Sequence, residues 1–267
     1  MVVKIVEKYI MKKIELEELR CIQLDILKCI DEFCRKNDIR YSLGGGTLLG
    51  AVRHKGYIPW DDDIDIIMPR VDYDKFVRTF DKYKPHLICG AYENDASFIY
   101  PFSKVYDNRT VQKEHDFKVG IGVNVDLFPI DGSPNREMAR RWHYQKVFIW
   151  RLLLSARNKN AFGIKRFWIK PFVDIIPLAV FQKNLQRLYR KYDLSQSKYA
   201  GSLISGFNDC SPAEIFNSYI ELPFEGFKFM AIRNYDIYLH VLYGNYMQFP
   251  PVEQRVPSHK SMVYWNE

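Results

Sequence analysis

The stretch that decides the fold reads GGGTLLG from Gly44 to Gly50 and, ten residues on, WDDDIDI from Trp60 to Ile66. A glycine-rich turn at a helix start presents successive backbone N–H groups, which favour an anion such as phosphate. Four aspartates within five positions repel one another, by roughly 1 kcal/mol per pair at about 5 Å in water and by more where water is partly excluded. Such repulsion is best explained by a cation among the carboxylates. The stretch therefore predicts a phosphate-binding turn beside a metal site.

The spacing of the aspartates indicates which of them share the metal. If residues 61–65 are extended, side chains two apart lie on one face, so Asp61, Asp63 and Asp65 point one way and Asp62 the other. Magnesium takes oxygen ligands at about 2.1 Å, and an ion held by two or three protein oxygens keeps positions open for substrate phosphates. The pattern predicts Mg²⁺, or Mn²⁺ in its place, as the cofactor.

Two other ion-binding or phosphate-binding motifs fit less well. The glycine turn is not a Walker A loop, because no G-x-x-x-x-G-K-[ST] occurs in the chain. The aspartates begin like a calcium-binding EF-hand loop, but Ile66 stands at its glycine position and Asp72 at the position of its final glutamate. A solvated acidic turn is the remaining alternative to a metal site.

The surrounding sequence alternates between helical and strand patterns. Thr47 is expected to be the N-cap of a short helix that ends near Lys55. Alternating strands and helices predict an α/β domain. The expected helices are 14–37, 47–55 and 69–83, and the expected strands are 39–43, 64–68, 98–105 and 121–128.

The net charge of +7 is concentrated in one region. Residues 136–191 contain 14 Lys or Arg against two acidic residues, and apolar runs such as 147–154 and 175–181 lie between the basic clusters. This pattern predicts a helical segment with one of three roles: packing on the domain, nucleic-acid binding or peripheral membrane contact. We favour the membrane surface, with no nucleic-acid partner.

The composition and the cysteines predict where the protein acts. No apolar run approaches the ~18 residues of a membrane-spanning helix, and the N-terminal sequence lacks the apolar core of a signal peptide. The five cysteines are odd in number and include no C-x-x-C pair, which is typical of free thiols in a reducing compartment. We expect a cytoplasmic protein, at the inner face of the membrane if residues 136–191 bind lipid.

The motifs together resemble the LicD/fukutin family of the polymerase-β-like nucleotidyltransferase superfamily. The similarity extends over about residues 16–260 except the basic segment. Its motifs are GGGTLLGAVRHKGYIPWDDDIDIIMPR at 44–70, FSKV at 102–105, GVNVDLFPID at 122–131, and YGNY at 243–246 with Pro250, Pro251, Arg255 and His259. The resemblance implies an α/β (α+β) fold, in which helices flank a nucleotidyltransferase-type mixed sheet. We expect a catalytic core at 1–135, a helical basic insertion at 136–195 and a C-terminal extension at 196–267 that completes the core.

The same resemblance implies roles for individual residues. Asp63 and Asp65 correspond to metal ligands, and Asp61 to a less certain third member of the cluster. Asp126 corresponds to the third carboxylate of the superfamily, which binds a second metal and takes the proton of the attacking hydroxyl. The substrate-binding candidates are Gly45, Gly46 and Thr47 at the phosphate, Arg53, His54 and Lys104 at the diphosphate or nucleotide, and Arg255 and His259 in the tail. A role at the surface, without substrate contact, is an equally good interpretation for the five basic residues Arg53, His54, Lys104, Arg255 and His259.

Bacterial members of this family transfer phosphocholine from CDP-choline to sugars of teichoic acid or lipopolysaccharide, and related members use CDP-ribitol. The resemblance therefore implies a metal-dependent phosphotransferase that uses CDP-choline or another CDP-alcohol, releases CMP and acts on a lipid-linked glycan. Two alternatives stay open at this point. One is a nucleotidylyltransferase that places NMP on a small hydroxylated acceptor, and the other is a non-catalytic protein that binds glycan or lipid.

Overall fold

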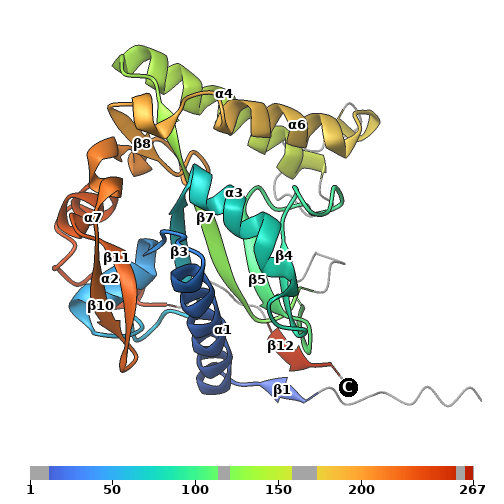
Figure 1. Cartoon of the computed structure of the whole chain (residues 1–267), viewed down its shortest axis with the longest axis vertical. Helices are drawn as coiled ribbons and strands as arrows, with labels where there is room; N and C mark the ends of the chain where they lie inside the picture. The colour runs from blue at the N-terminus through green and yellow to red at the C-terminus, as the bar shows by residue number, and fades with distance from the viewer. Residues whose placement is uncertain (1–11, 114–120, 158–172, 257–261, 267) are drawn as a thin grey trace, which may run out of the picture.

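A central mixed sheet organises the molecule (Figure 1). The computed structural model describes residues 12–113, 121–157, 173–256 and 262–266. The strand order is β2-β3-β7-β5-β4, in which β3 and β7 are parallel and their other partners antiparallel. The strands are β2 (Ser42–Leu43), β3 (Asp65–Pro69), β4 (Leu87–Gly90), β5 (Ser103–Asp107) and β7 (Asn124–Ser133), and β8 (Tyr199–Gly201) pairs with the end of β7 and with β9 (Ser211–Pro212).

Three helices of the N-terminal half pack around this sheet. Helix α1 (Leu16–Lys36) buries the apolar face that its helical period predicts, and its acidic first turn and basic last turn complement the helix dipole. Helix α3 (Arg70–Thr79) continues as η1 (Phe80–Lys82), and Phe76 and Phe80 contact Phe33 of α1 edge to face. Helix α2 (Gly45–Arg53) joins β2 to the aspartate loop. This half of the molecule therefore has one continuous core.

The C-terminal part adds two small sheets and a helix to that core. β10 (Tyr219–Phe224) and β11 (Phe227–Ile232) form a hairpin beside α2, and α7 (Tyr235–Tyr243) follows it (Figure 1). Near the C-terminus, β12 (Met262–Trp265) lies between β1 (Lys13–Ile14) and β6 (Thr110–Lys113). The short helices are η2 (Leu194–Gln196), η3 (Phe207–Asp209), η4 (Ala213–Asn217) and η5 (Val252–Gln254).

The described part of the basic segment is helical, as predicted. Helices α4 (Glu137–Arg157) and α6 (Leu178–Tyr189) run side by side across the top of Figure 1 and share a second apolar core. Phe128 of β7 contacts both cores, so the helices pack on the domain. Within the described ranges, no helix has the length and apolarity needed to cross a bilayer.

The predicted fold class is confirmed: helices flank a mixed sheet in an α+β arrangement. Several predicted boundaries differ. β2 has only two residues, β5 begins at Ser103 instead of residue 98, and β7 runs on to Ser133, five residues past its predicted end. The division of the chain at residues 135 and 195 stays a prediction.

Candidate active site

Two predicted catalytic aspartates meet across the parallel strand pair. Asp65 opens β3 and is in register with Asp126 of β7, and the Asp126 N–H donates to the carbonyl of Ile64 at 2.9 Å. Desolvation raises the pKa of Asp65 well above its ordinary value, and the negative charges of Asp63 and Asp126 raise it further. These residues, about sixty positions apart in sequence, therefore form one site.

The glycines allow helix α2 to approach the carboxylates closely. A β-carbon at Gly46 would lie 2.8 Å from Asp61 Oδ2, and one at Gly45 would lie 3.2 Å from Asp65 Oδ2. Gly45 also has φ +45°, a left-handed conformation that favours glycine. Both predicted phosphate-turn glycines thus border the aspartates.

Thr47 supports β3 instead of capping helix α2, and its predicted contact with the phosphate stays a prediction. The helix begins at Gly45 with Gly44 in the N-cap position, so the prediction that Thr47 is the N-cap is wrong. Its buried side chain instead accepts a hydrogen bond at 2.8 Å from the backbone N–H of Asp65. Thr47 therefore fixes the start of β3.

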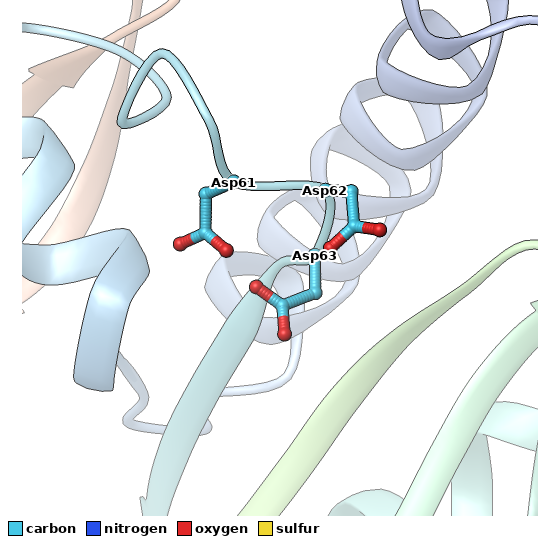
Figure 2. A group of neighbouring side chains, drawn as sticks. All are labelled: Asp61, Asp62 and Asp63. Carbon is cyan, nitrogen blue, oxygen red and sulfur yellow. The ribbon is translucent and has the colours of Figure 1, made fainter. Parts of the chain in front are cut away.

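The loop before β3 brings three carboxylates together. Oxygens of Asp61, Asp62 and Asp63 all lie within 4.8 Å of one another, and Figure 2 shows the three side chains close together in the loop before β3. The prediction that Asp62 points away is wrong, because β3 begins only at Asp65 and strand alternation does not apply before it. The group that could hold a metal thus includes Asp62 as well.

Helix α1 holds this loop in place. Arg20 Nη2 donates to the carbonyl of Pro59 at 3.0 Å, and Gln23 Nε2 donates to that of Asp62 at 3.0 Å. Both donors come from the half-buried or buried side of α1. The sequence interpretation missed both residues, since neither belongs to a recognisable motif.

Lys104 forms an ion pair with Asp126, and its predicted contact with the diphosphate or nucleotide stays a prediction. The two residues are in register between β5 and β7, and Lys104 Nζ lies 2.6 and 2.8 Å from the two oxygens of Asp126. Asn124 Nδ2 donates to the same carboxylate. A small cavity of about 50 Å³ is lined by these three residues together with Asp62 and Asp63. Lys104 thus supplies a positive charge inside the acidic site.

Arg53, His54 and Arg255 form a basic cluster near the same loop. Arg53 Nη1 donates to the carbonyl of Tyr246 at 2.9 Å. Burial lowers the pKa of Arg53, and the charge of Arg255 lowers it further. Burial likewise lowers the pKa of His54, followed by the charge of Arg53. Across the ranges that the structure describes, neither arginine pairs with a carboxylate. His259 lies outside the described residues.

Aromatic rings surround this basic cluster. The Arg255 guanidinium lies 5.5 Å from the ring centre of Trp60 and 5.4 Å from that of Phe249. Arg53 lies 4.6 Å from the Phe249 ring, which is 47% exposed. Two arginines with no acidic partner among the described residues, beside the exposed Phe249 ring and the half-buried Trp60 ring, form a surface suited to a nucleotide diphosphate.

A second cavity, of about 180 Å³, is lined in part by Asp65. Its wall includes Asp65 and Gly45 together with Asp209, Tyr238 and Tyr243 from the C-terminal part. The sequence interpretation assigned no role to Asp209. It is an isolated aspartate that stands in no motif, and nothing in the residue pattern points to it.

Comparison with known proteins places this geometry in a family. Residues 38–176, which include Asp61–Asp65 and Asp126, match the family model described as LicD/FKTN/FKRP, nucleotidyltransferase domain. The lipopolysaccharide cholinephosphotransferase LicD of Haemophilus influenzae is 33% identical over 272 aligned positions, which cover 95% of this chain and 99% of that protein. The chain belongs to the LicD family. A relationship of this extent makes it an enzyme of the transferase class.

Two further relatives match shorter parts of the LicD-family chain. An uncharacterised protein of Rickettsia typhi is 39% identical over 90 residues, or 30% of the chain. An uncharacterised protein of Rickettsia prowazekii is 46% identical over 56 residues, or 21% of the chain. The Haemophilus protein, in contrast, aligns well beyond residue 176, so its similarity extends into the C-terminal part that carries α7.

Proposed function

We propose that this LicD-family chain transfers phosphocholine, or a related phospho-alcohol, from a CDP-activated donor to a sugar hydroxyl of a lipopolysaccharide or teichoic acid precursor. The observation that carries the proposal is the register of Asp65 with Asp126 beside the Asp61–Asp63 loop. Similarity to a lipopolysaccharide cholinephosphotransferase over nearly the whole chain supports choline as the alcohol.

The carboxylates fit a hard divalent cation. All candidate ligands are oxygens, and three of them converge within 4.8 Å. A cation there would also offset the repulsion that raises the pKa of Asp65. Asp63 and Asp65, with Asp61, Asp62 and Asp126 as neighbours, would hold Mg²⁺ or Mn²⁺. When bound, the metal would neutralise charge on the diphosphate.

The remaining chemistry is assigned to the chain's own residues. The acceptor hydroxyl oxygen forms a bond to the phosphorus that carries choline, the bond from that phosphorus to the bridging oxygen breaks, and CMP leaves with the bridging oxygen. Asp126 takes the hydroxyl proton. Lys104 holds Asp126 in place, and its positive charge would attract the transferred phosphoryl group. Arg53 and Arg255 bind the diphosphate, and Trp60 and Phe249 border the nucleoside.

The nature of the products distinguishes this reaction from nucleotidylyl transfer. Purified protein is incubated with Mg²⁺, lipopolysaccharide and CDP-choline, CDP-ribitol or a nucleoside triphosphate in separate reactions. We expect CMP from CDP-choline and no pyrophosphate from any triphosphate. Pyrophosphate release would instead support nucleotidylyl transfer, and the absence of turnover with every donor would support a non-catalytic role.

Arg255→Ala is expected to raise KM for CDP-choline about tenfold with little change in kcat, because it removes a charge-assisted contact to the diphosphate. Steady-state kinetics measures both constants. Arg233→Ala removes an exposed arginine in the turn after β11 and serves as the matched control. A KM for Arg255→Ala equal to that of the control would exclude Arg255 from the donor site.

We also propose that α4 contacts the membrane from the cytoplasmic side, where it would reach a lipid-linked acceptor. Met138, Trp142 and Ile149 are 75%, 65% and 52% exposed, and their spacing of four and seven places them on one helix face. Arg141 and Lys146 are exposed beside them. An exposed apolar face flanked by basic residues favours an anionic lipid surface.

The protein is expected to sediment with anionic phosphatidylglycerol vesicles at low salt and to be released at high salt. Trp142→Glu should weaken this binding several-fold, whereas Val71→Glu, at a residue 76% exposed on α3, should leave it unchanged. Equal sedimentation with neutral and anionic vesicles, or equal effects of the two substitutions, would leave α4 with a packing role only.

A further inference from the structure

We infer that the 180 Å³ cavity between β7 and α7 binds the quaternary ammonium group of the donor's choline; this rests on the proposed phosphocholine transfer. The α7 cavity, as we call it, is partly open to solvent. Its volume exceeds the roughly 150 Å³ of an engineered cavity that accepts benzene, so a trimethylammonium group fits. Six residues carry the argument: Asp65, Phe128, Ser202, Asp209, Tyr238 and Tyr243.

The charge of the α7 cavity favours a cation. Asp65 and Asp209 both line it, and the described lining residues include no Lys, Arg or His. A phosphate or another anion would therefore be repelled. The hydroxyl of Ser202, buried in the same wall, also has no hydrogen-bond partner among the described atoms.

Asp209 differs from the other buried aspartates of the described chain. Asp72, Asp107 and Asp131 each pair with an arginine. Asp209 is only 2% exposed, has no basic partner in the described ranges, and its Oδ1 accepts no hydrogen bond. Burial raises the pKa of Asp209 to about 7. A buried carboxylate oxygen without a partner is costly, and a cation in the cavity would remove that cost.

The aromatic residues favour a quaternary ammonium over a metal ion or a small amine. Phe128, Tyr238 and Tyr243 contribute apolar surface to the wall. Methyl groups on nitrogen donate no hydrogen bonds and pack well against aromatic rings, whose π-systems attract the positive charge. A divalent metal would need several more oxygen ligands than this wall provides.

The α7 cavity is continuous with the catalytic aspartates. Asp65 and Gly45 form one end of it, and the Tyr243 hydroxyl lies 3.7 Å from the position of a β-carbon on Gly45. Burial raises the pKa of Tyr243, and the charges of Asp65 and then Asp209 raise it further; all three residues line the same cavity. An ammonium group at Asp209 therefore directs the attached phosphate toward Asp65.

The test compares CDP-choline with the neutral donor CDP-3,3-dimethylbutanol, in which a carbon replaces the choline nitrogen. For the wild-type protein we expect kcat/KM to favour CDP-choline by roughly tenfold or more. In Asp209→Asn the ratio of the two kcat/KM values should fall toward one. Activity with CDP-choline should drop, whereas activity with the neutral donor should stay unchanged. The substitution removes a buried charge without changing side-chain size, so thermal unfolding should show a folded variant. Asp25→Asn, at an exposed aspartate of α1, is the matched control.

The outcomes separate this inference from the proposed function. If the wild-type protein uses CDP-choline and Asp209→Asn keeps the wild-type preference, the α7 cavity does not bind the ammonium group although phosphocholine transfer stands. If the wild-type protein prefers the neutral donor, or if Asp209→Asn lowers activity with both donors equally, the inference is overturned as well. Failure of the wild-type protein to use CDP-choline at all overturns both proposals.

Discussion

Asp65→Asn is expected to lower the rate of transfer from CDP-choline by a factor on the order of 10³, the scale of losing a key electrostatic contact to the transition state. Asp65 is the only aspartate of the 61–65 run that lies within a strand, and it is held by Thr47 and paired in register with Asp126. Both contacts use the backbone of Asp65. The substitution therefore removes the side-chain charge but keeps the hydrogen bond to Thr47 and the pairing of β3 with β7.

The stability of Asp65→Asn shows whether its loss of activity comes from the site or from unfolding of the protein. The raised pKa of Asp65 means that ionising it in the folded protein is unfavourable, so Asp65→Asn should be at least as stable as the wild-type protein without metal. Added Mg²⁺ should raise the melting temperature of the wild-type protein and of Asp25→Asn, but not that of Asp65→Asn. Activity within tenfold of wild type in Asp65→Asn would contradict a catalytic role.

Asp131→Ala is expected to destabilise the fold by about 3–5 kcal/mol, the usual cost of leaving one member of a buried ion pair unpaired. Arg70, at the start of α3, donates from Nε and Nη2 to the two oxygens of Asp131 at 2.7 and 2.6 Å. The side chains are 12% and 2% exposed. The pair joins α3 to the end of β7, next to the strands that hold the active site.

Urea unfolding measures this loss, and a double-mutant cycle with Arg70→Met provides the control. Arg70→Met/Asp131→Ala should be more stable than Asp131→Ala alone, because it no longer buries a guanidinium that has lost its hydrogen-bonded carboxylate and keeps only the more distant Asp74. A loss below 1 kcal/mol in Asp131→Ala, or no recovery in the double variant, would show that the pair contributes little.

The sequence was sufficient to predict the helices and strands that follow from a local residue pattern. It was also sufficient to predict the carboxylates that belong to recognisable motifs. The helical period of residues 14–37 predicted α1, and the apolar run 64–68 predicted β3 within one residue. The family resemblance grouped Asp126 with the 61–65 run, and the register of β3 with β7 places Asp126 beside Asp65.

What the sequence did not predict depends on contacts between distant segments. The conformation of the 61–63 loop is set by Arg20 and Gln23 of α1, which overrides the alternation expected of an extended chain. The ion pair between Lys104 and Asp126 was not predicted, because it depends on the register of β5 with β7. Asp209 reaches the site only through the packing of α7, which no local pattern encodes.

The fate of a doubly labelled donor tests the central claim most directly. CDP-choline carrying one isotope in the choline methyl groups and another in the cytidine is incubated with the protein, Mg²⁺ and lipopolysaccharide, and the glycan is then examined by mass spectrometry. We predict that the glycan gains the choline label and that the cytidine label is recovered only in CMP. Cytidine label on the glycan, or a glycan that gains neither label while CDP-choline is left intact, would contradict phosphocholine transfer.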